Sequence, residues 1–168
     1  MGKIRRSVIF FMTLSLVSCL MFANAFASEA PDDDSALAGL NMPAKAFFDI
    51  NIGASPETYA ASMEKLALYL DVIGQTYDSL MSQGADPDII VVFRGAAVTL
   101  VTENASEQVK VLIAALAKKQ IKFEACNVAT TLTGTPNTAI LPQVKVVGNT
   151  FVSAIGYQSA GYRYIIIQ

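Results

Sequence analysis

A single cysteine is the side chain of this sequence best suited to covalent chemistry. The chain has 168 residues, with two cysteines and no histidine. Cys126 follows a predicted strand and its thiolate would be a nucleophile, whereas Cys19 lies in an N-terminal apolar segment. The absence of histidine excludes Ser-His-Asp and Cys-His catalytic arrangements, histidine-ligated haem and two-histidine zinc sites. Thiol chemistry therefore needs another means of activating Cys126.

Polar and small residues follow the ends of several predicted strands. The carboxyl ends of parallel strands lie at one edge of a sheet, where ligand sites form. At that edge we expect Cys126 to be the nucleophile and Arg94 to stabilise its thiolate, because a neighbouring cation favours the charged form of a thiol. The other residues expected there, as ligand contacts, are Gly95, Asn127, Asn149 and Thr150.

Several of these residues have simpler structural alternatives. Asn149 and Thr150 precede a predicted helix, where short polar side chains cap free N–H groups. Cys126 could be a small hydrophobic side chain in the core. Arg94 could serve in a structural ion pair. Its acidic candidates are Asp49, Glu103 and Glu124.

Alternating strand and helix patterns position these residues. Apolar or alternating stretches predict strands at residues 45–52, 88–93, 121–125, 144–147 and 162–167. Residues 89–93 are apolar on both faces, which is typical of a strand buried in a parallel sheet. Strands that alternate with helices predict the α/β class, here a three-layer α/β/α sandwich around a mostly parallel five-stranded sheet.

Helices are predicted between the strands. Residues 55–57 form a helix start, and an apolar stripe runs from there to residue 84, where a glycine ends the helix. A second helix begins at Asn104 or Ser106, and a third, capped by Thr150, begins at Phe151 and ends at Gly161. Residues 127–142 are rich in Thr, Gly and Pro and are predicted to form an irregular loop.

Composition and motifs exclude several functions. A formal charge of −2 offers no basic surface for nucleic acid, and two cysteines without histidine cannot build a structural zinc site. No Gly-x-Gly or Gly-Lys-Ser/Thr phosphate loop is present. Residues 52–57 could pass for a flavodoxin-type phosphate turn, but they lack its repeated Thr and Gly. We therefore expect neither a metal nor a cofactor.

The N-terminus has the pattern of a bacterial secretory signal peptide over residues 1–27. Lys3, Arg5 and Arg6 form a basic start, residues 7–23 are uncharged and largely apolar, and Ala25 and Ala27 are the small residues of a cleavage site. We expect cleavage after Ala27, a periplasmic or secreted protein, and no membrane span after cleavage. The cleaved chain would keep one cysteine, which indicates a free thiol or an intermolecular partner.

Two alternatives to simple cleavage are open. The apolar segment could remain as a membrane anchor, although it is marginally short for a bilayer. Residues 16–19, Leu-Val-Ser-Cys, also look like a lipobox, which would make Cys19 the acylated first residue of an anchored lipoprotein. Residues 28–42 contain the acidic run Asp32-Asp33-Asp34 and are predicted to be a flexible acidic tether before a domain at residues 43–168.

Three segments of the chain resemble the DsrE family, and more narrowly its exported, uncharacterised branch. They are the strand ending in Phe-Arg-Gly at residues 93–95, the strand that runs into Cys126, and the tail VVGNT…GYQ…GY over residues 146–162. The resemblance covers essentially everything after Pro43. One departure is clear: many relatives have His-Gly-Pro where this chain has Arg94-Gly95-Ala96.

The resemblance implies a function as well as a fold. Relatives have a DsrE-like α/β/α domain and often form homo- or hetero-oligomers. Cytoplasmic relatives pass sulfur as a persulfide on the cysteine that corresponds to Cys126. It therefore implies a sulfur carrier of sulfurtransferase type, with a protein donor or acceptor of sulfur as partner. The alternative is a non-catalytic ligand-binding or oligomeric assembly module in which Cys126 is structural.

The apolar tail independently predicts self-association. Residues 151–168 contain Arg163 as their one charged residue and end in Ile165-Ile166-Ile167-Gln168. A strand this apolar would promote aggregation if it lay uncovered at an open edge of a sheet. It is therefore either a central strand or covered by another subunit, and we expect a homo-oligomer.

Overall fold

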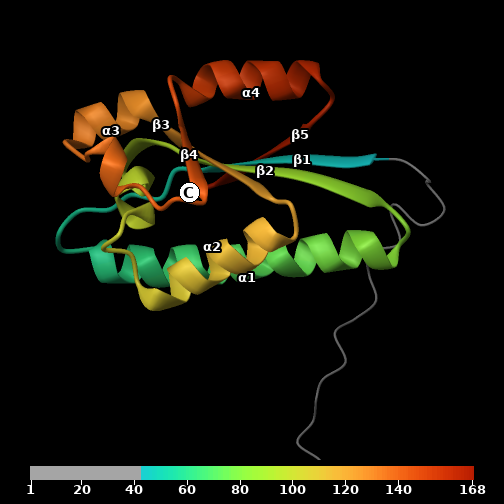
Figure 1. Ribbon diagram of the computed structural model, residues 1–168, viewed down its shortest axis with the longest axis horizontal. Coiled ribbons are helices and arrows are strands. Elements are labelled where there is room, and N and C mark those ends of the chain that lie inside the picture. Colours follow the sequence, from blue (N-terminus) through green and yellow to red (C-terminus); the bar gives the residue numbers. More distant parts are fainter. Residues whose placement is uncertain (1–42) are drawn as a thin grey trace, which may run out of the picture. The chain divides into compact units, whose positions relative to one another are not determined.

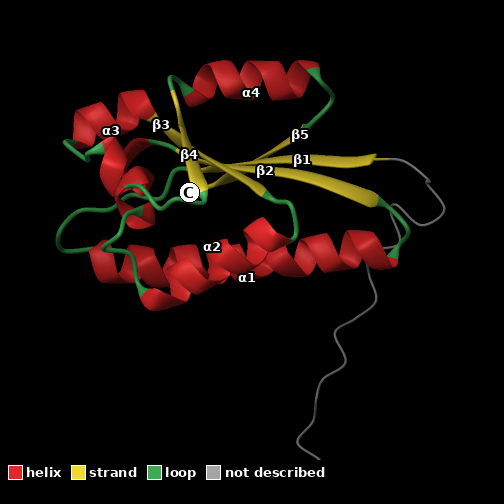
Figure 2. Ribbon diagram, in the orientation of Figure 1, coloured by secondary structure: helices red, strands yellow, loops and turns green. Residues whose placement is uncertain are grey.

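The computed structural model describes residues 43–168, which form one parallel sheet with helices on both of its faces (Figures 1 and 2). The predicted signal peptide, lipobox and acidic tether lie outside the described residues. The strands are β1 (Pro43–Ile50), β2 (Asp86–Phe93), β3 (Lys122–Cys126), β4 (Val144–Val147) and β5 (Arg163–Ile167). The α-helices are α1 (Tyr59–Ser82), α2 (Glu107–Lys118), α3 (Asn127–Thr133) and α4 (Thr150–Ser159). Short 3-10 helices cover η2 (Gly95–Val101) and η3 (Asn137–Ala139).

The sheet confirms the predicted fold class. Its strand order is β4-β3-β2-β1-β5, and all four neighbouring pairs are parallel. Figure 2 shows α1 and α2 on one face of the sheet and α3 and α4 on the other. The result is the three-layer α/β/α sandwich that strand-helix alternation predicts.

The two faces of the sheet carry cores of very different size. The core under α1 and α2 is continuous and includes Leu66, Leu70 and Ile113. Among residues 43–168, the core under α4 has four buried members, Phe47, Ile90, Val92 and Tyr162. Because α4 buries only Thr150, most of that helix faces away from the sheet. The thinner layer therefore leaves an apolar helix surface uncovered within the described chain.

Two helices differ from the sequence prediction. The long helix begins at Tyr59, because Ser55 and Thr58 bond to each other and form a separate turn before it. Residues 127–133, predicted to be loop, form α3. The threonine hydroxyls of this segment donate hydrogen bonds to backbone carbonyls of the same helix, for example Thr131 to Asn127 and Thr133 to Ala129. This back-bonding permits a helix in a composition that usually favours turns.

The terminal strand lies at the edge of the sheet. β5 pairs with β1 along residues 163–167, and none of the described strands lies beyond it. The interpretation of this apolar segment as a central strand is therefore wrong. Ile165 and Ile166 are exposed, while Ile167 is buried. Covering by another subunit is the interpretation that remains.

A backbone outlier at Gln120 gives a first stability prediction. Gln120 follows the C-cap of α2 with φ 68°, the left-handed region in which a side chain is strained. Replacing Gln120 by glycine removes that strain, so we expect the free energy of unfolding to rise by about 1 kcal/mol. Urea denaturation measures the change, with Gln83→Gly at the C-cap of α1 (φ −84°) as the control that should not gain. An unchanged or lower stability for Gln120→Gly would contradict the prediction.

Candidate functional site

The carboxyl edge of the sheet brings most of the predicted site residues to one cavity. β3 ends at Cys126, Arg94 and Gly95 follow β2, and Asn149 and Thr150 follow β4. All five line a cavity of about 320 Å³. Asn127, the remaining predicted contact, does not line it; the Asn127 side-chain oxygen accepts a hydrogen bond of 2.6 Å from the Asn137 amide. The topology thus assembles a thiol, a guanidinium and a hydroxyl from three loops.

Cys126 is held where the protein favours its thiolate. Cys126 is 5% exposed and directly precedes α3. Burial alone would raise the pKa of the Cys126 thiol, but hydrogen bonding from the hydroxyl and N–H of Thr150 and from the N–H groups of Ala129 and Val128 outweighs burial and lowers it. Within residues 43–168, the groups that favour the Cys126 thiolate are therefore a threonine and backbone N–H groups.

Thr150 is the residue most closely linked to the sulfur. It is 2% exposed and begins α4, and its Oγ1 makes no hydrogen bond of normal geometry with residues 43–168. The hydroxyl is nevertheless near enough to Cys126 to stabilise the thiolate. The cap of α4 is Asn149, whose side-chain oxygen accepts from the Phe151 N–H at 2.9 Å. Thr150 is therefore not the helix cap, and its hydroxyl is free to act at the cavity.

Replacing Thr150 by valine is expected to raise the pKa of Cys126. Valine keeps the shape of threonine and removes the hydroxyl that favours the thiolate. The rate of iodoacetamide alkylation follows the thiolate fraction, so its midpoint should move to higher pH and the rate at pH 7 should fall several-fold. Thr133→Val is the matched control, because Thr133 lines the same cavity but bonds to the Ala129 carbonyl. Equal pH profiles for the two variants would contradict the prediction.

Arg94 is fixed by a buried carboxylate. Its Nε donates to both oxygens of Asp49 at 2.8 Å, and its guanidinium carbon lies 5.7 Å from the centre of the Phe151 ring. Asp49 is 2% exposed and also accepts a hydrogen bond from the Tyr164 hydroxyl. The structural ion pair open from the sequence is therefore present, with Asp49 as the partner. Arg94 also lines the cavity that holds Cys126, and it acts electrostatically on the Tyr164 hydroxyl that bonds to Asp49.

Gly95 keeps the backbone beside Arg94 in a turn that other residues cannot make. It has φ 56°, and a Cβ built on it would lie 2.5 Å from the Asn51 side-chain oxygen. The first constraint strains any L-residue and the second leaves no room for one. Gly95 thus lets η2 begin directly after Arg94 and places both residues at the cavity wall.

Comparison with known proteins identifies the family of this fold and site. The DsrE/DsrF-like family model matches residues 45–167. The chain belongs to the DsrE/DsrF-like family. No curated protein matches its sequence. The resemblance expected from the sequence is thereby confirmed for the family, and Cys126 and Arg94 both lie inside the matched region of this DsrE/DsrF-like domain.

Three solved structures are similar to this chain. A protein of unknown function from Methanobacterium thermoautotrophicum is similar to this DsrE/DsrF-like chain with a TM-score of 0.58 and 18% identity, over 73% of this chain and 97% of the other. The ychN protein from E. coli gives 0.49 and 13%, over 73% and 99%. A protein of unknown function from Bacteroides thetaiotaomicron gives 0.49 and 19%, over 79% and 99%. The first of these supports the DsrE-like fold.

Sequence reasoning missed the apolar wall of the DsrE/DsrF-like site. Val128, Leu132 and Phe151 line the cavity and are exposed, Leu132 to 82%. We call these three residues the apolar rim. Val128 and Leu132 are four residues apart, a helical spacing that would have placed both on one face if residues 127–133 had been recognised as a helix. The thiol therefore lies beneath an apolar entrance.

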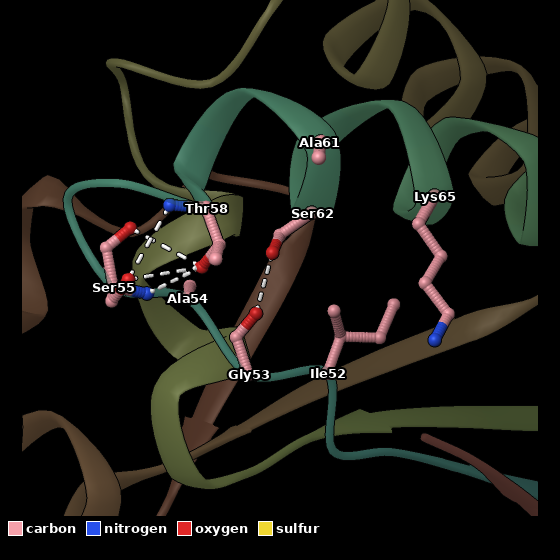
Figure 3. Close-up of a pocket in the computed structure, with 8 residues that line it drawn as sticks. All are labelled: Ile52, Gly53, Ala54, Ser55, Thr58, Ala61, Ser62 and Lys65. Carbon is pink, nitrogen blue, oxygen red and sulfur yellow. Dashed lines mark hydrogen bonds between the residues drawn. The ribbon is translucent and has the colours of Figure 1, made fainter.

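A second hollow at the carboxyl edge of the sheet is formed by a turn whose polar groups bond to one another (Figure 3). It is lined by residues of the β1–α1 loop and the start of α1, which include Ser55, Thr58 and Ser62. The hydroxyls of Ser55 and Thr58 lie 3.2 Å apart, Ser62 donates to the Gly53 carbonyl, and Ser55 also donates to Glu57. These polar groups are committed to one another, and the Glu57 carboxylate that bonds to Ser55 would repel a phosphate.

Between residues 43 and 168, no three acidic or cysteine side chains gather in a way that could hold a metal ion. No helix in that range combines the length and apolar character needed to cross a bilayer.

Proposed function

We propose that this DsrE/DsrF-like protein carries sulfane sulfur as a persulfide on Cys126. The observation that carries the proposal is the position of Cys126 at the end of β3, in a cavity where Thr150 and backbone N–H groups favour its thiolate. Membership of a sulfur-relay superfamily supports the same chemistry. The apolar rim supports a protein or organic donor, because it would pack against either and exclude water during transfer.

The transfer step needs no redox partner. The Cys126 thiolate attacks the outer sulfur of a donor persulfide, R–S–SH, so that a bond forms between Sγ and that sulfur while the S–S bond of the donor breaks. The electron pair of the broken bond leaves with R–S⁻, and the proton stays on the transferred sulfur. Arg94 and the hydroxyl of Thr150 line the same cavity and can hold the anionic groups of this step.

Intact mass measurement tests the function. The full-length protein is incubated with inorganic polysulfide, and we expect a gain of one sulfur atom, about 32 Da, that dithiothreitol removes. Cys126→Ser should gain nothing. Thr150→Val should gain sulfur more slowly, while Thr133→Val should match the natural sequence. An unmodified protein whose Cys126 also resists iodoacetamide while folded would refute the proposal.

One observation favours a second function, a ligand-binding or assembly module with a structural cysteine. Cys126 is 5% exposed, an extent typical of a cysteine that packs as a small hydrophobe. In that case Cys126→Ser would leave ligand binding and assembly unchanged and would lower only the stability of the fold. The same mass experiment separates the two functions, because a structural cysteine stays unmodified in the folded protein.

We also propose that the protein is exported and self-associates. The signal pattern of residues 1–27 supports cleavage after Ala27 and a periplasmic or secreted location, with acylation at Cys19 as the alternative. N-terminal sequencing of the protein from cell fractions distinguishes a chain that starts at Ser28 from a lipid-modified chain that starts at Cys19. The uncovered faces of α4 and β5 support the homo-oligomer.

A further inference from the structure

A second candidate binding site, separate from the cysteine cavity, contains Glu124 of β3. Glu124 is 7% exposed, and its Oε1 accepts a hydrogen bond of 2.9 Å from the Tyr157 hydroxyl. Its other oxygen, Oε2, is buried and has no hydrogen-bond partner within residues 43–168. A buried carboxylate oxygen without a donor is costly, so it indicates a missing partner. Glu124 lines a surface hollow of about 380 Å³.

Three polar side chains near Glu124 can donate hydrogen bonds and have no partner among the described residues. Gln120, Gln143 and Lys145 line the same hollow, and their side chains make no hydrogen bond or ion pair with the described residues. Lys145 is the register partner of Glu124 on β4, yet the two do not pair. The other lysine of the hollow, Lys122, is occupied by Asp88 at 3.1 Å. One buried acceptor thus faces an array of uncommitted donors.

This arrangement selects for a ligand with both charges. A simple cation would be attracted by Glu124 but repelled by the two lysines. A simple anion would be attracted by Lys145 but repelled by Glu124. A molecule with an ammonium group and a nearby carboxylate satisfies both sides at once. The cavity volume is at the lower end of the range for small-molecule sites. We propose that the Glu124 hollow binds a free amino acid, with its ammonium on Glu124 and its carboxylate on Lys145.

Gln120 supports a role for the hollow beyond packing. Its φ of 68° is a conformation that favours glycine, and the described chain has no other such non-glycine residue. The strain holds an amide at the wall of the hollow, where it can donate to a carboxylate and accept from an ammonium. A strained backbone that also presents a free polar group is typical of binding sites. Gln120→Gly is therefore expected to stabilise the fold and to weaken binding.

Calorimetric titration of the full-length protein tests the site. The probes are the twenty common L-amino acids, after a thermal-shift survey at millimolar concentration. We expect at least one to bind saturably with one site per chain. For L-alanine, the single-charge analogues ethylamine and propionate should fail. The dipeptide L-alanyl-L-alanine, whose charges lie further apart, should bind more weakly; a dipeptide that binds as well as the free amino acids would overturn the assignment to free amino acids.

Matched variants assign the binding to this hollow. Glu124→Gln keeps the shape of the side chain and Lys145→Met removes an exposed charge, so both variants should fold. Each should weaken binding by roughly tenfold or more. Glu64→Gln and Lys118→Met, at exposed residues outside this hollow, should bind as before. Binding that survives both site variants, or no saturable binding by any amino acid, would overturn the proposal. Cys126→Ser should still bind, which separates this site from the proposed sulfur chemistry.

Discussion

Replacing Asp49 by alanine is expected to lower the free energy of unfolding by about 3 kcal/mol. Asp49 is almost fully buried between Arg94, which donates to both of its oxygens, and Tyr164. Removing the carboxylate leaves a guanidinium and a phenol without their partner. Because the Arg94 side chain is 22% exposed, water can solvate the guanidinium once the carboxylate is gone. The loss of stability therefore lies at the low end of the range for a broken buried ion pair. Urea denaturation at pH 7 measures it.

Two further measurements make this prediction specific. Burial and the hydrogen bond and charge of Asp49 raise the pKa of Tyr164, so Asp49→Ala should lower that pKa in a spectroscopic titration of tyrosinate. The control is Asp78→Ala, which breaks the exposed pair with Lys119 and should cost no more than about 1 kcal/mol. If the two alanine variants lost equal stability, Asp49 would be no more than a surface partner of Arg94.

The Asp49 pair also bears on the thiol site. Arg94 lines the Cys126 cavity, and Asp49 fixes the Nε edge of its guanidinium. The carboxylate of Asp49 neutralises much of the positive charge of the Arg94 guanidinium, so Arg94 acts at the cavity mainly as a directed hydrogen-bond donor. We therefore expect Arg94 to act on the anionic groups of a sulfur donor, while Thr150 and the backbone N–H groups determine the thiolate population of Cys126.

The fold could be predicted from the sequence because its strands have strong local signals. Residues 89–93 are apolar on both faces, and this is the inner strand β2. Five strands separated by helical patterns left few topologies other than a parallel sheet with helices on both faces. The carboxyl-edge rule then brought Cys126, Arg94 and Thr150 to one cavity without any knowledge of strand order.

The remaining features depend on contacts distant in sequence. Strand order is one example: β5 follows α4 in the chain but pairs with β1, so the Ile-rich strand is an edge strand and not an internal one. The partner of Arg94 is another, because three carboxylates were available and only the register of β1 beside β2 selects Asp49. Helix α3 was hidden for a local reason, since its threonines satisfy carbonyls of their own helix in a way that composition does not reveal.

The outer face of α4 predicts that the protein self-associates. Phe151, Val152 and Ile155 form an outer face of α4 that is 61–67% exposed, and Ile166 of the edge strand β5 is 53% exposed on the same side of the sheet. Exposed apolar side chains on a helix, together with an apolar edge strand, favour association with another subunit. We expect the full-length protein to have, by light scattering at micromolar concentration, a mass that is a multiple of one chain.

A pair of aspartate variants locates the interface. Ile155→Asp places a charge on the outer face of α4 and should shift the mass to that of one chain, because burying an unpaired carboxylate in an apolar interface is costly. Val111→Asp is the matched control: Val111 is 58% exposed on α2, which covers the opposite face of the sheet, and it should leave the mass unchanged. Phe151 belongs both to this face and to the rim of the Cys126 cavity, so dissociation by Ile155→Asp should also speed alkylation of Cys126. A single-chain mass for the natural sequence would contradict the prediction and would leave the apolar face of α4 to a different partner.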